Sequence, residues 1–371
     1  MITTLEMTDY RCFEEYRIDG LKRVNLLVGR NNSGKTAVLE AVQLLTEAEN
    51  PGVLAAICER RGELVRVSGL FVGRRYYPRN LGLPEIAHLF RGHGVKLGAE
   101  LRIADGARSL ALKIGNIELQ EEQLFFRDPD SDEPPTRVAT YAAQAHLGDA
   151  KEPAWTVLID EAGALLEDLQ RRRATGGDRS TWERVGIVSP SSFGPETLAA
   201  LWNRTLRGKR ERAIVDALRV MDERVSGIVF EAAGSHGLSD KSGILIDLGE
   251  ERVPLASAGD GMFRLLQMAL TLVEAPGSVV LFDEIDTGLH WSLLGESWRL
   301  VIETARDRNL QVFATTHSKD CIEGLAWMCQ THPQLAREVS LQTIDPRLEE
   351  AVAADSEEIV SMVHHGIEMR T

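Results

Sequence analysis

The stretch Gly29-Arg30-Asn31-Asn32-Ser33-Gly34-Lys35-Thr36 decides the fold, because it fits the phosphate-binding pattern GxxxxGK followed by Ser or Thr. Residues 23–28, directly before it, are a short apolar run typical of a buried strand. Residues 34–47 then place apolar side chains at helical spacing. A plain glycine turn before a helix is the alternative interpretation. The order strand, glycine loop, helix favours a site in which backbone N–H groups and a helix N-terminus hold phosphates.

The residues of this glycine loop have distinct expected roles. Lys35 is expected to neutralise the β- and γ-phosphates of a nucleotide, which gives it a part in catalysis as well as in binding. Thr36 is expected to ligate Mg²⁺ through its hydroxyl group. The other residues of the loop that we expect to bind the nucleotide are Gly29, Asn31, Asn32, Ser33 and Gly34.

A second candidate site lies at Ser278-Val279-Val280-Leu281-Phe282-Asp283-Glu284, an apolar run that ends in two acids. This pattern is expected of a buried strand that delivers carboxylates at its carboxyl end. Asp283 suits Mg²⁺ ligation. Because side chains alternate along a strand, Glu284 should lie on the other side, where it could act as general base on the attacking water. The run alone could be merely a strand end, and its pairing with the glycine loop favours the catalytic interpretation.

The rest of the chain alternates between strand and helix patterns. Short alternating runs from about 64 to 119 indicate an antiparallel sheet. Residues 128–135, rich in proline and carboxylates, are typical of an exposed loop. From 278 to 366, strands and helices follow one another in the order that favours a parallel core sheet. We therefore predict an α/β fold with a parallel core sheet around the glycine loop and an antiparallel β-subdomain.

A helical and charged segment interrupts this pattern. Residues 158–226 are predicted to be an inserted helical lobe, which leaves a discontinuous head of residues 1–157 and 227–371. Basic side chains gather in the lobe, where they either contact DNA or a partner or form a solvated helix face. They are Arg171, Arg172, Arg173, Arg204, Arg207, Lys209, Arg210 and Arg212.

The composition limits the classes of function. The chain has 42 Lys and Arg against 56 Asp and Glu, a formal charge of −14, so its average surface repels nucleic-acid phosphates. Its four cysteines lack metal-ligand spacing and are expected to be buried free thiols in a reducing cytoplasm. No stretch has the length and apolarity of a membrane span. We expect a cytoplasmic protein with no membrane partner, in which any nucleic-acid contact uses a local basic patch.

Three further segments follow one another in a recognisable order. They are Ser257-Ala258-Gly259-Asp260-Gly261, Asp286-Thr287-Gly288-Leu289-His290 and Phe313-Ala314-Thr315-Thr316-His317-Ser318. Together with the glycine loop and the acidic strand, they resemble the signature motif, the D-loop and the switch-histidine strand of ABC-type ATPases. The resemblance is to the branch that contains the RecF-like, SMC-like and overcoming-lysogenization-defect (OLD) proteins. It covers residues 1–157 and 227–345.

This resemblance implies an ABC ATPase head that binds ATP with Mg²⁺ and forms a homodimer closed around two nucleotides. Ser257 and Gly259 would grip the γ-phosphate held by the opposite subunit, although alone they are typical of a turn and helix N-cap. Asp286 would contribute to nucleotide binding from the D-loop. His317 would act in catalysis as a γ-phosphate sensor, although a histidine after a strand can also be structural.

The first strand and the segment that would join the lobe match the family's pattern less closely than the other motifs do. Tyr10-Arg11-Cys12-Phe13 resembles the family's first-strand segment, which implies that Arg11 reaches the phosphates and that an aromatic ring lies near the base. A surface arginine and a core phenylalanine are the alternative. No glutamine occupies the lobe-joining loop, for which the best-aligned segment is His88-Leu89-Phe90-Arg91. The family's glutamine Mg²⁺ ligand is therefore unassigned, and the signature lacks the Leu-Ser-Gly-Gly-Gln form of transporters.

Two classes of function compete on this basis. In the first, dimer closure driven by ATP controls a separate nucleic-acid-processing effector, expected to be a nuclease, in phage defence or DNA repair as the resemblance implies. We expect the nuclease on another chain, because only 54 residues follow His317. In the second, the protein is a nucleotide-gated scaffold with slow turnover that sequesters or recruits a toxin or another effector protein.

Overall fold

The parallel core sheet carries the glycine loop and the acidic pair at one edge. A computed structural model describes residues 1–67, 70–72, 75–77, 81–116, 125–126, 136–137, 141–166, 185–189, 195–230, 243–275, 277 and 279–367. The predicted loop 128–135 and the basic residues 171–173 lie outside these ranges. The sheet has the strand order β14 (Val185–Val188), β18 (Val279–Phe282), β19 (Gln311–Thr315), β3 (Val24–Val28), β20 (Val339–Thr343) and β21 (Val352–Ala354).

All pairings in this sheet are parallel except the one between β20 and β21. Successive side chains of each inner strand belong to different hydrophobic cores, as strand alternation requires. Leu26 of β3 packs in one core and Leu27 in the other. The predicted α/β fold with a parallel core sheet is therefore confirmed, and both of its faces are covered.

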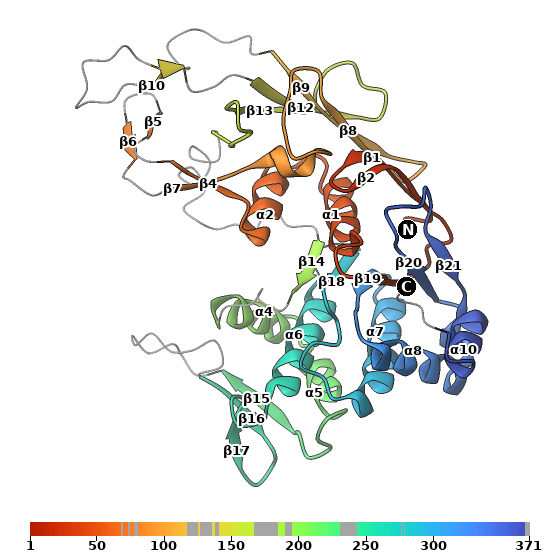
Figure 1. Ribbon diagram of the computed structural model, residues 1–371. Helices are drawn as coiled ribbons and strands as arrows, with labels where there is room; N and C mark the ends of the chain where they lie inside the picture. Colours follow the sequence, from red (N-terminus) through yellow and green to blue (C-terminus); the bar gives the residue numbers. More distant parts are fainter. Residues whose placement is uncertain are drawn as a thin grey trace.

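An antiparallel sheet lies over one face of the core sheet, with helices between them (Figure 1). Its strand order is β13 (Trp155–Ile159), β12 (Tyr141–Leu147), β9 (Ser109–Gly115), β8 (Glu100–Ala104), β1 (Leu5–Tyr10) and β2 (Phe13–Ile18). The helices in between are α1 (Lys35–Thr46) and α2 (Gly52–Arg61). This arrangement confirms the predicted antiparallel β-subdomain and places the start of α1 at the carboxyl edge of the core sheet.

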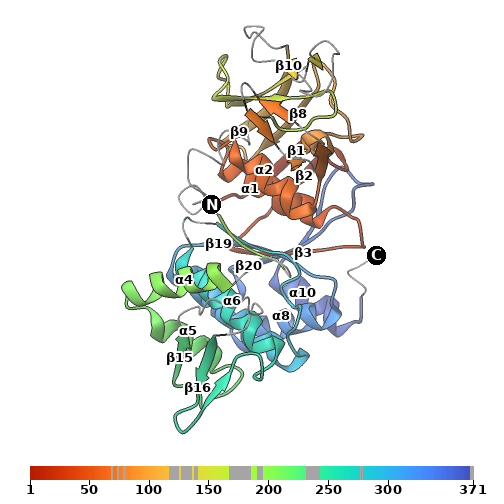
Figure 2. The same cartoon turned by 90° about the vertical axis from the view of Figure 1, so that its left-hand side faces the viewer.

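Helices cover the opposite face of the core sheet, as the rotated view in Figure 2 also shows. They are α6 (Asp260–Glu274), α7 (Leu294–Asp307), α8 (Lys319–Thr331), α9 (Pro333–Ala336) and α10 (Ser356–His364). The short 3₁₀ helices are Ile86–Leu89 and Trp291–Leu293. Four small antiparallel sheets complete the described strands. Three of them have two strands each: β4 (Leu64–Val67) with β7 (Leu81–Pro84), β5 (Leu70–Val72) with β6 (Arg75–Tyr77), and β10 (Phe125–Phe126) with β11 (Thr136–Arg137). The fourth has the order β15 (Gly227–Phe230), β16 (Ile244–Asp247) and β17 (Arg252–Pro254).

The range 158–226, predicted as an inserted lobe, contains a strand of the core sheet. Val185–Val188 pairs in parallel with β18, so this part of the range belongs to the head. The helices α4 (Pro195–Arg207) and α5 (Glu211–Leu218) share the core that contains α6. Their apolar stripes could be read from sequence, but the surface that buries them could not. The division of the chain into two domains otherwise stays a prediction.

Candidate nucleotide site

The glycine loop joins β3 to α1 in a conformation that needs its glycines. Gly29 has φ 144° and Gly34 has φ 93°, in the region that side chains disfavour. A Cβ atom on Gly29 would lie 2.4 Å from the carbonyl oxygen of Ile344, and one on Gly34 would lie 2.5 Å from the ring of Phe13. The two glycines therefore let the loop turn tightly between β20 and the first hairpin, and they leave the N-terminus of α1 facing the site.

Lys35 lies beneath the loop. Its side chain is buried, and Nζ donates hydrogen bonds to the carbonyl oxygens of Gly29 at 2.9 Å and Arg30 at 2.8 Å. Burial lowers the pKa of Lys35 to about 8, while the carboxylates of Asp283 and Glu284 act in the opposite direction. The ammonium group thus stands between the loop and both acids, as a phosphate-neutralising lysine must.

Asp283 meets Thr36 where β18 and β3 end at the same edge of the sheet. The Thr36 hydroxyl lies 3.3 Å and 3.5 Å from the two carboxylate oxygens of Asp283. A carboxylate and a hydroxyl this close, beside a phosphate-binding loop, fit the sparse oxygen ligand set that Mg²⁺ takes from proteins when a nucleotide supplies the rest. Thr36 and Asp283 are thus the residues that could hold Mg²⁺.

Glu284 follows in an uncommon backbone conformation, with φ 50°. Its carboxylate is exposed and accepts a hydrogen bond from the Thr287 hydroxyl at 3.2 Å. Its carbonyl oxygen accepts a 2.8 Å hydrogen bond from Arg264, a buried residue of α6 that also donates to the carbonyls of Asp283 and Ser189. Arg264, on the helix that follows the signature segment, therefore stabilises the backbone turn that leaves the Glu284 carboxylate exposed.

Thr315, at the end of β19, joins the two acids. Its hydroxyl donates to Asp283 at 2.7 Å and accepts from the backbone N–H of Glu284 at 2.8 Å, and the residue is 1% exposed. Sequence reasoning assigned it no role, although its position at the end of an apolar run was a usable signal. We interpret Thr315 as a positioning residue that holds the carboxylate of Asp283 and the backbone of Glu284.

Thr315→Val keeps the shape of the side chain and removes both hydrogen bonds. We expect kcat for ATP hydrolysis to fall by at least about 10-fold with a smaller change in KM, because a buried partner is left unsatisfied. Thr315→Ser should restore most of the rate. Thr331→Val is the matched control, since that hydroxyl bonds carbonyls of its own helix. Equal rates for Thr315→Val and wild type would show that the hydroxyl is dispensable.

The signature segment lies at the start of α6. Ser257 and Gly259 are exposed, at the N-terminus of α6. The described residues that line the cavities beside the glycine loop include neither of them. The start of α6 instead packs on the D-loop, because a Cβ atom on Gly261 would lie 3.1 Å from the carbonyl oxygen of Gly288.

The D-loop and the switch strand are joined by a hydrogen bond. Asp286 accepts from the Thr316 hydroxyl at 2.5 Å. The neighbouring His317 is partly buried, and both this burial and the Lys35 ammonium lower the pKa of its imidazole. The carboxylates of Glu284, Asp286 and Asp283 act on this pKa in the opposite direction, so His317 lies among the charged groups of the site.

The structure does not bring Arg11 to the glycine loop. Arg11 is 7% exposed, and its guanidinium pairs with Glu40 at 2.7 Å and with Glu63 at 2.6 Å. Tyr10 and Phe13, from the same segment, are fully buried. Sequence reasoning missed the two glutamates as partners, because they lie in α1 and beside α2, far along the chain. Neither aromatic ring is exposed for stacking on a base.

The end of β14 lies next to the two acids. The segment His88-Leu89-Phe90-Arg91, which was the best-aligned segment for the lobe-joining loop, does not lie there. The backbone N–H of Asp283 bonds the carbonyl of Val188 at 2.8 Å, and Ser189 lines a cavity with Thr36, Asp283 and Glu284. The 88–91 segment instead packs beside β1, where Tyr10 forms a bridge with Phe90. Sequence reasoning could not place β14 beside the acids, because its pairing with β18 is a long-range contact with no local signal.

Among the described basic residues, Arg210 is paired with buried Glu274, while Arg204, Arg207, Lys209 and Arg212 are exposed. A DNA contact through them stays a prediction.

All four cysteines are free, three of them buried and Cys12 exposed. No helix among the described residues has the length and apolarity needed to cross a membrane.

Several known proteins are similar to this chain over most of its length. An "ATP/GTP phosphatase" of Helicobacter pylori is 23% identical over 354 residues, covering 88% of this chain and 87% of that protein. An SMC head bound to the C-winged helix domain of ScpA is similar at 14% identity and TM-score 0.49, covering 96% of this chain and 98% of that one. The SMC head domain from Thermotoga maritima gives 14% identity and TM-score 0.41, covering 95% of this chain and 98% of that one.

A family model described as "AAA domain, putative AbiEii toxin, Type IV TA system" matches residues 24–320. The match begins at β3 and ends just after His317, so it spans the glycine loop, the acidic pair, the D-loop and the switch strand. The chain belongs to this family and is a P-loop ATPase.

Proposed function

We propose that this ATPase binds Mg-ATP, closes as a two-fold homodimer around two nucleotides and thereby controls a separate effector protein. The observation that carries the proposal is the position of the signature segment. Ser257 and Gly259 are exposed and lie outside the cavities that border the glycine loop of their own chain. A two-fold dimer uses each surface twice, so the segment of one subunit can complete the phosphate site of the other.

Within each closed site, each of the chain's own residues would have a separate role. Lys35 neutralises phosphate charge, and Glu284 removes a proton from the attacking water as general base. His317 would hydrogen-bond the γ-phosphate. Thr36 and Asp283 would hold Mg²⁺, which when bound supplies charge neutralisation at the phosphates. The link from α6 through Arg264 to the Glu284 backbone would make catalysis sensitive to what the signature segment contacts.

The effector would recognise the closed dimer. A preference of only about 1–3 kcal/mol for the closed over the open form regulates a partner about 5- to 150-fold. The charged outer faces of α4 and α5, with Leu206 45% exposed, offer a docking surface. A nuclease in phage defence or DNA repair is our first candidate for the effector, in line with the resemblance to the OLD branch.

A second candidate function follows from the family description, which names a toxin of a type IV TA system. In that case the ATPase would be a nucleotide-gated scaffold with slow turnover, and its partner would be a protein of such a system. Both candidates need a partner that responds to the nucleotide state. They differ in whether that partner processes nucleic acid.

A pull-down from the native host with Mg-ATP tests the proposal. We expect the Glu284→Gln variant, held in the nucleotide-bound state, and the Lys35→Ala variant, unable to bind the phosphates, to retain a partner in amounts that differ at least about 5-fold. A retained nuclease supports the first candidate, and a retained protein without such activity supports the second. If no form retains a protein and the purified chain alone cleaves DNA in Mg²⁺, the separate effector does not exist.

A further inference from the structure

A cavity of about 660 Å³ lies on the side of the glycine loop opposite the acids. It lies between Arg30–Ser33 of the loop and Ile344–Arg347, the segment that follows β20. The segment after β20 stays beside the start of the loop, since Ile344 donates its backbone N–H to Val28 at 2.8 Å and a Cβ atom on Gly29 would lie 2.4 Å from the Ile344 carbonyl oxygen. The volume is within the range of about 300–1,000 Å³ usual for small-molecule sites.

The order of the strands indicates where this cavity lies relative to a bound nucleotide. The acids follow β18 on one side of β3, and the cavity follows β20 on the other side. Ligands of parallel sheets lie across the carboxyl ends of the strands. If the γ-phosphate and the metal lie toward Asp283, the nucleoside end of the same ligand extends toward β20. The cavity is therefore on the path that the nucleoside takes.

Arg347 supplies a flat cationic surface at the cavity. Its side chain is 69% exposed, and its Nε donates to the two carboxylate oxygens of Asp345 at 2.8 Å and 3.1 Å. These hydrogen bonds lower the pKa of Asp345 to about 2, so the pair stays charged at neutral pH. Asp345 is itself fixed, because its backbone N–H bonds the Tyr16 hydroxyl at 3.2 Å. A guanidinium held this way is preorganised to stack on a base.

The aromatic side chains of the first hairpin are not exposed for stacking. Tyr10 and Phe13 of the first hairpin are buried at 0% and 1% exposure, as described above. Arg30 of the glycine loop is exposed and lines the cavity opposite Arg347. The cavity thus offers a polar, cationic surface on which a ring can stack. The carboxylate of Asp345 lies beside that surface.

We propose that this cavity holds the ribose and base of the bound nucleoside triphosphate, with the base stacked on the Arg347 guanidinium and Asp345 positioning that guanidinium. The inference rests on the proposed function, since it assumes phosphates in the glycine loop. Stacking uses the face of a ring, so it accepts adenine and guanine alike. The site accordingly does not discriminate strongly between adenine and guanine.

The test compares three ligands on the full chain by calorimetry with Mg²⁺: non-hydrolysable analogues of ATP and GTP, and inorganic tripolyphosphate. Arg347→Ala should weaken both analogues by about 5- to 150-fold, the usual range for one stacked base, and leave tripolyphosphate unchanged. Arg347→Lys should not restore affinity, because an ammonium group has charge without a plane. Asp345→Asn should give a smaller loss of the same kind.

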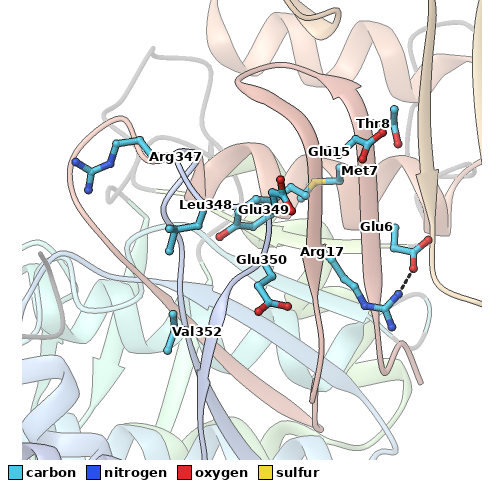
Figure 3. A pocket seen from close by; sticks show the side chains of 11 residues that line it. Glu6, Met7, Thr8, Glu15, Arg17, Arg347, Leu348, Glu349, Glu350 and Val352 are labelled. Atoms are coloured by element: carbon cyan, nitrogen blue, oxygen red, sulfur yellow. Dashed lines mark hydrogen bonds and ion pairs between the residues drawn. The ribbon is translucent and has the colours of Figure 1, made fainter.

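Arg17→Ala is the matched control. Arg17 is 49% exposed, pairs with Asp19 and lines the neighbouring groove that also contains Arg347. Figure 3 shows the two guanidinium groups on opposite sides of that groove, pointing away from each other. Wild-type affinity of Arg347→Ala for both analogues would overturn the nucleoside site while the proposed function stands. Equal losses for tripolyphosphate would show a phosphate role and also overturn it. Failure of wild type to bind either analogue would overturn both.

Discussion

Glu284→Gln is expected to bind Mg-ATP and to hydrolyse it at least ~100-fold more slowly than wild type, the usual scale for losing a general base. The amide matches the carboxylate in size and cannot take the proton from water. The backbone of Glu284 is held by Thr315 and Arg264, whose hydrogen bonds the substitution does not touch. Phosphate release in the steady state and nucleotide binding at equilibrium together separate chemistry from affinity.

A matched control is Glu303→Gln, which removes a half-exposed carboxylate from α7 that pairs with Arg299. That variant should hydrolyse ATP at the wild-type rate. The slowed Glu284→Gln variant should also accumulate as a dimer with Mg-ATP, which light scattering would report as a doubled mass. Undiminished hydrolysis by Glu284→Gln would remove this residue from the role of base.

The central part of the site could be predicted from sequence because its determinants are local. The glycine loop is fixed by the backbone freedom of Gly29 and Gly34 within one turn. Asp283 and Glu284 follow a run of four buried residues, and such a run has few places in a fold other than an inner strand. Parallel strands bring these carboxyl ends together, so the meeting of Thr36 with Asp283 was a consequence of strand order.

The remaining parts depend on contacts that no local pattern specifies. Arg11 looked available for phosphate, but folding places Glu40 and Glu63 against it. Val185–Val188 is too short to be recognised within a range whose sequence pattern predicts helices, and only its pairing with β18 makes it part of the core sheet. Arg347 became a candidate only once β20 was known to lie next to β3.

Two inactive variants of the protein are expected to recover ATP hydrolysis when they are mixed. Lys35→Ala removes the phosphate lysine from both sites of a homodimer, and Ser257→Arg blocks the signature segment at both sites. Each variant alone should hydrolyse ATP at background level. Ser257 is exposed, so the larger side chain is compatible with the fold, and unchanged thermal unfolding would verify this.

A mixed dimer has one site built from the intact Lys35 of one chain and the intact Ser257 of the other. With random pairing, half of the dimers are mixed and half of their sites are complete, so the mixture should recover up to roughly a quarter of the wild-type rate. This steady-state rate of the one-to-one mixture tests most directly whether the nucleotide site is shared between two chains. A rate clearly above the sum of the separate variants is the predicted result. A rate equal to that sum, or wild-type hydrolysis by Ser257→Arg alone, would contradict the account.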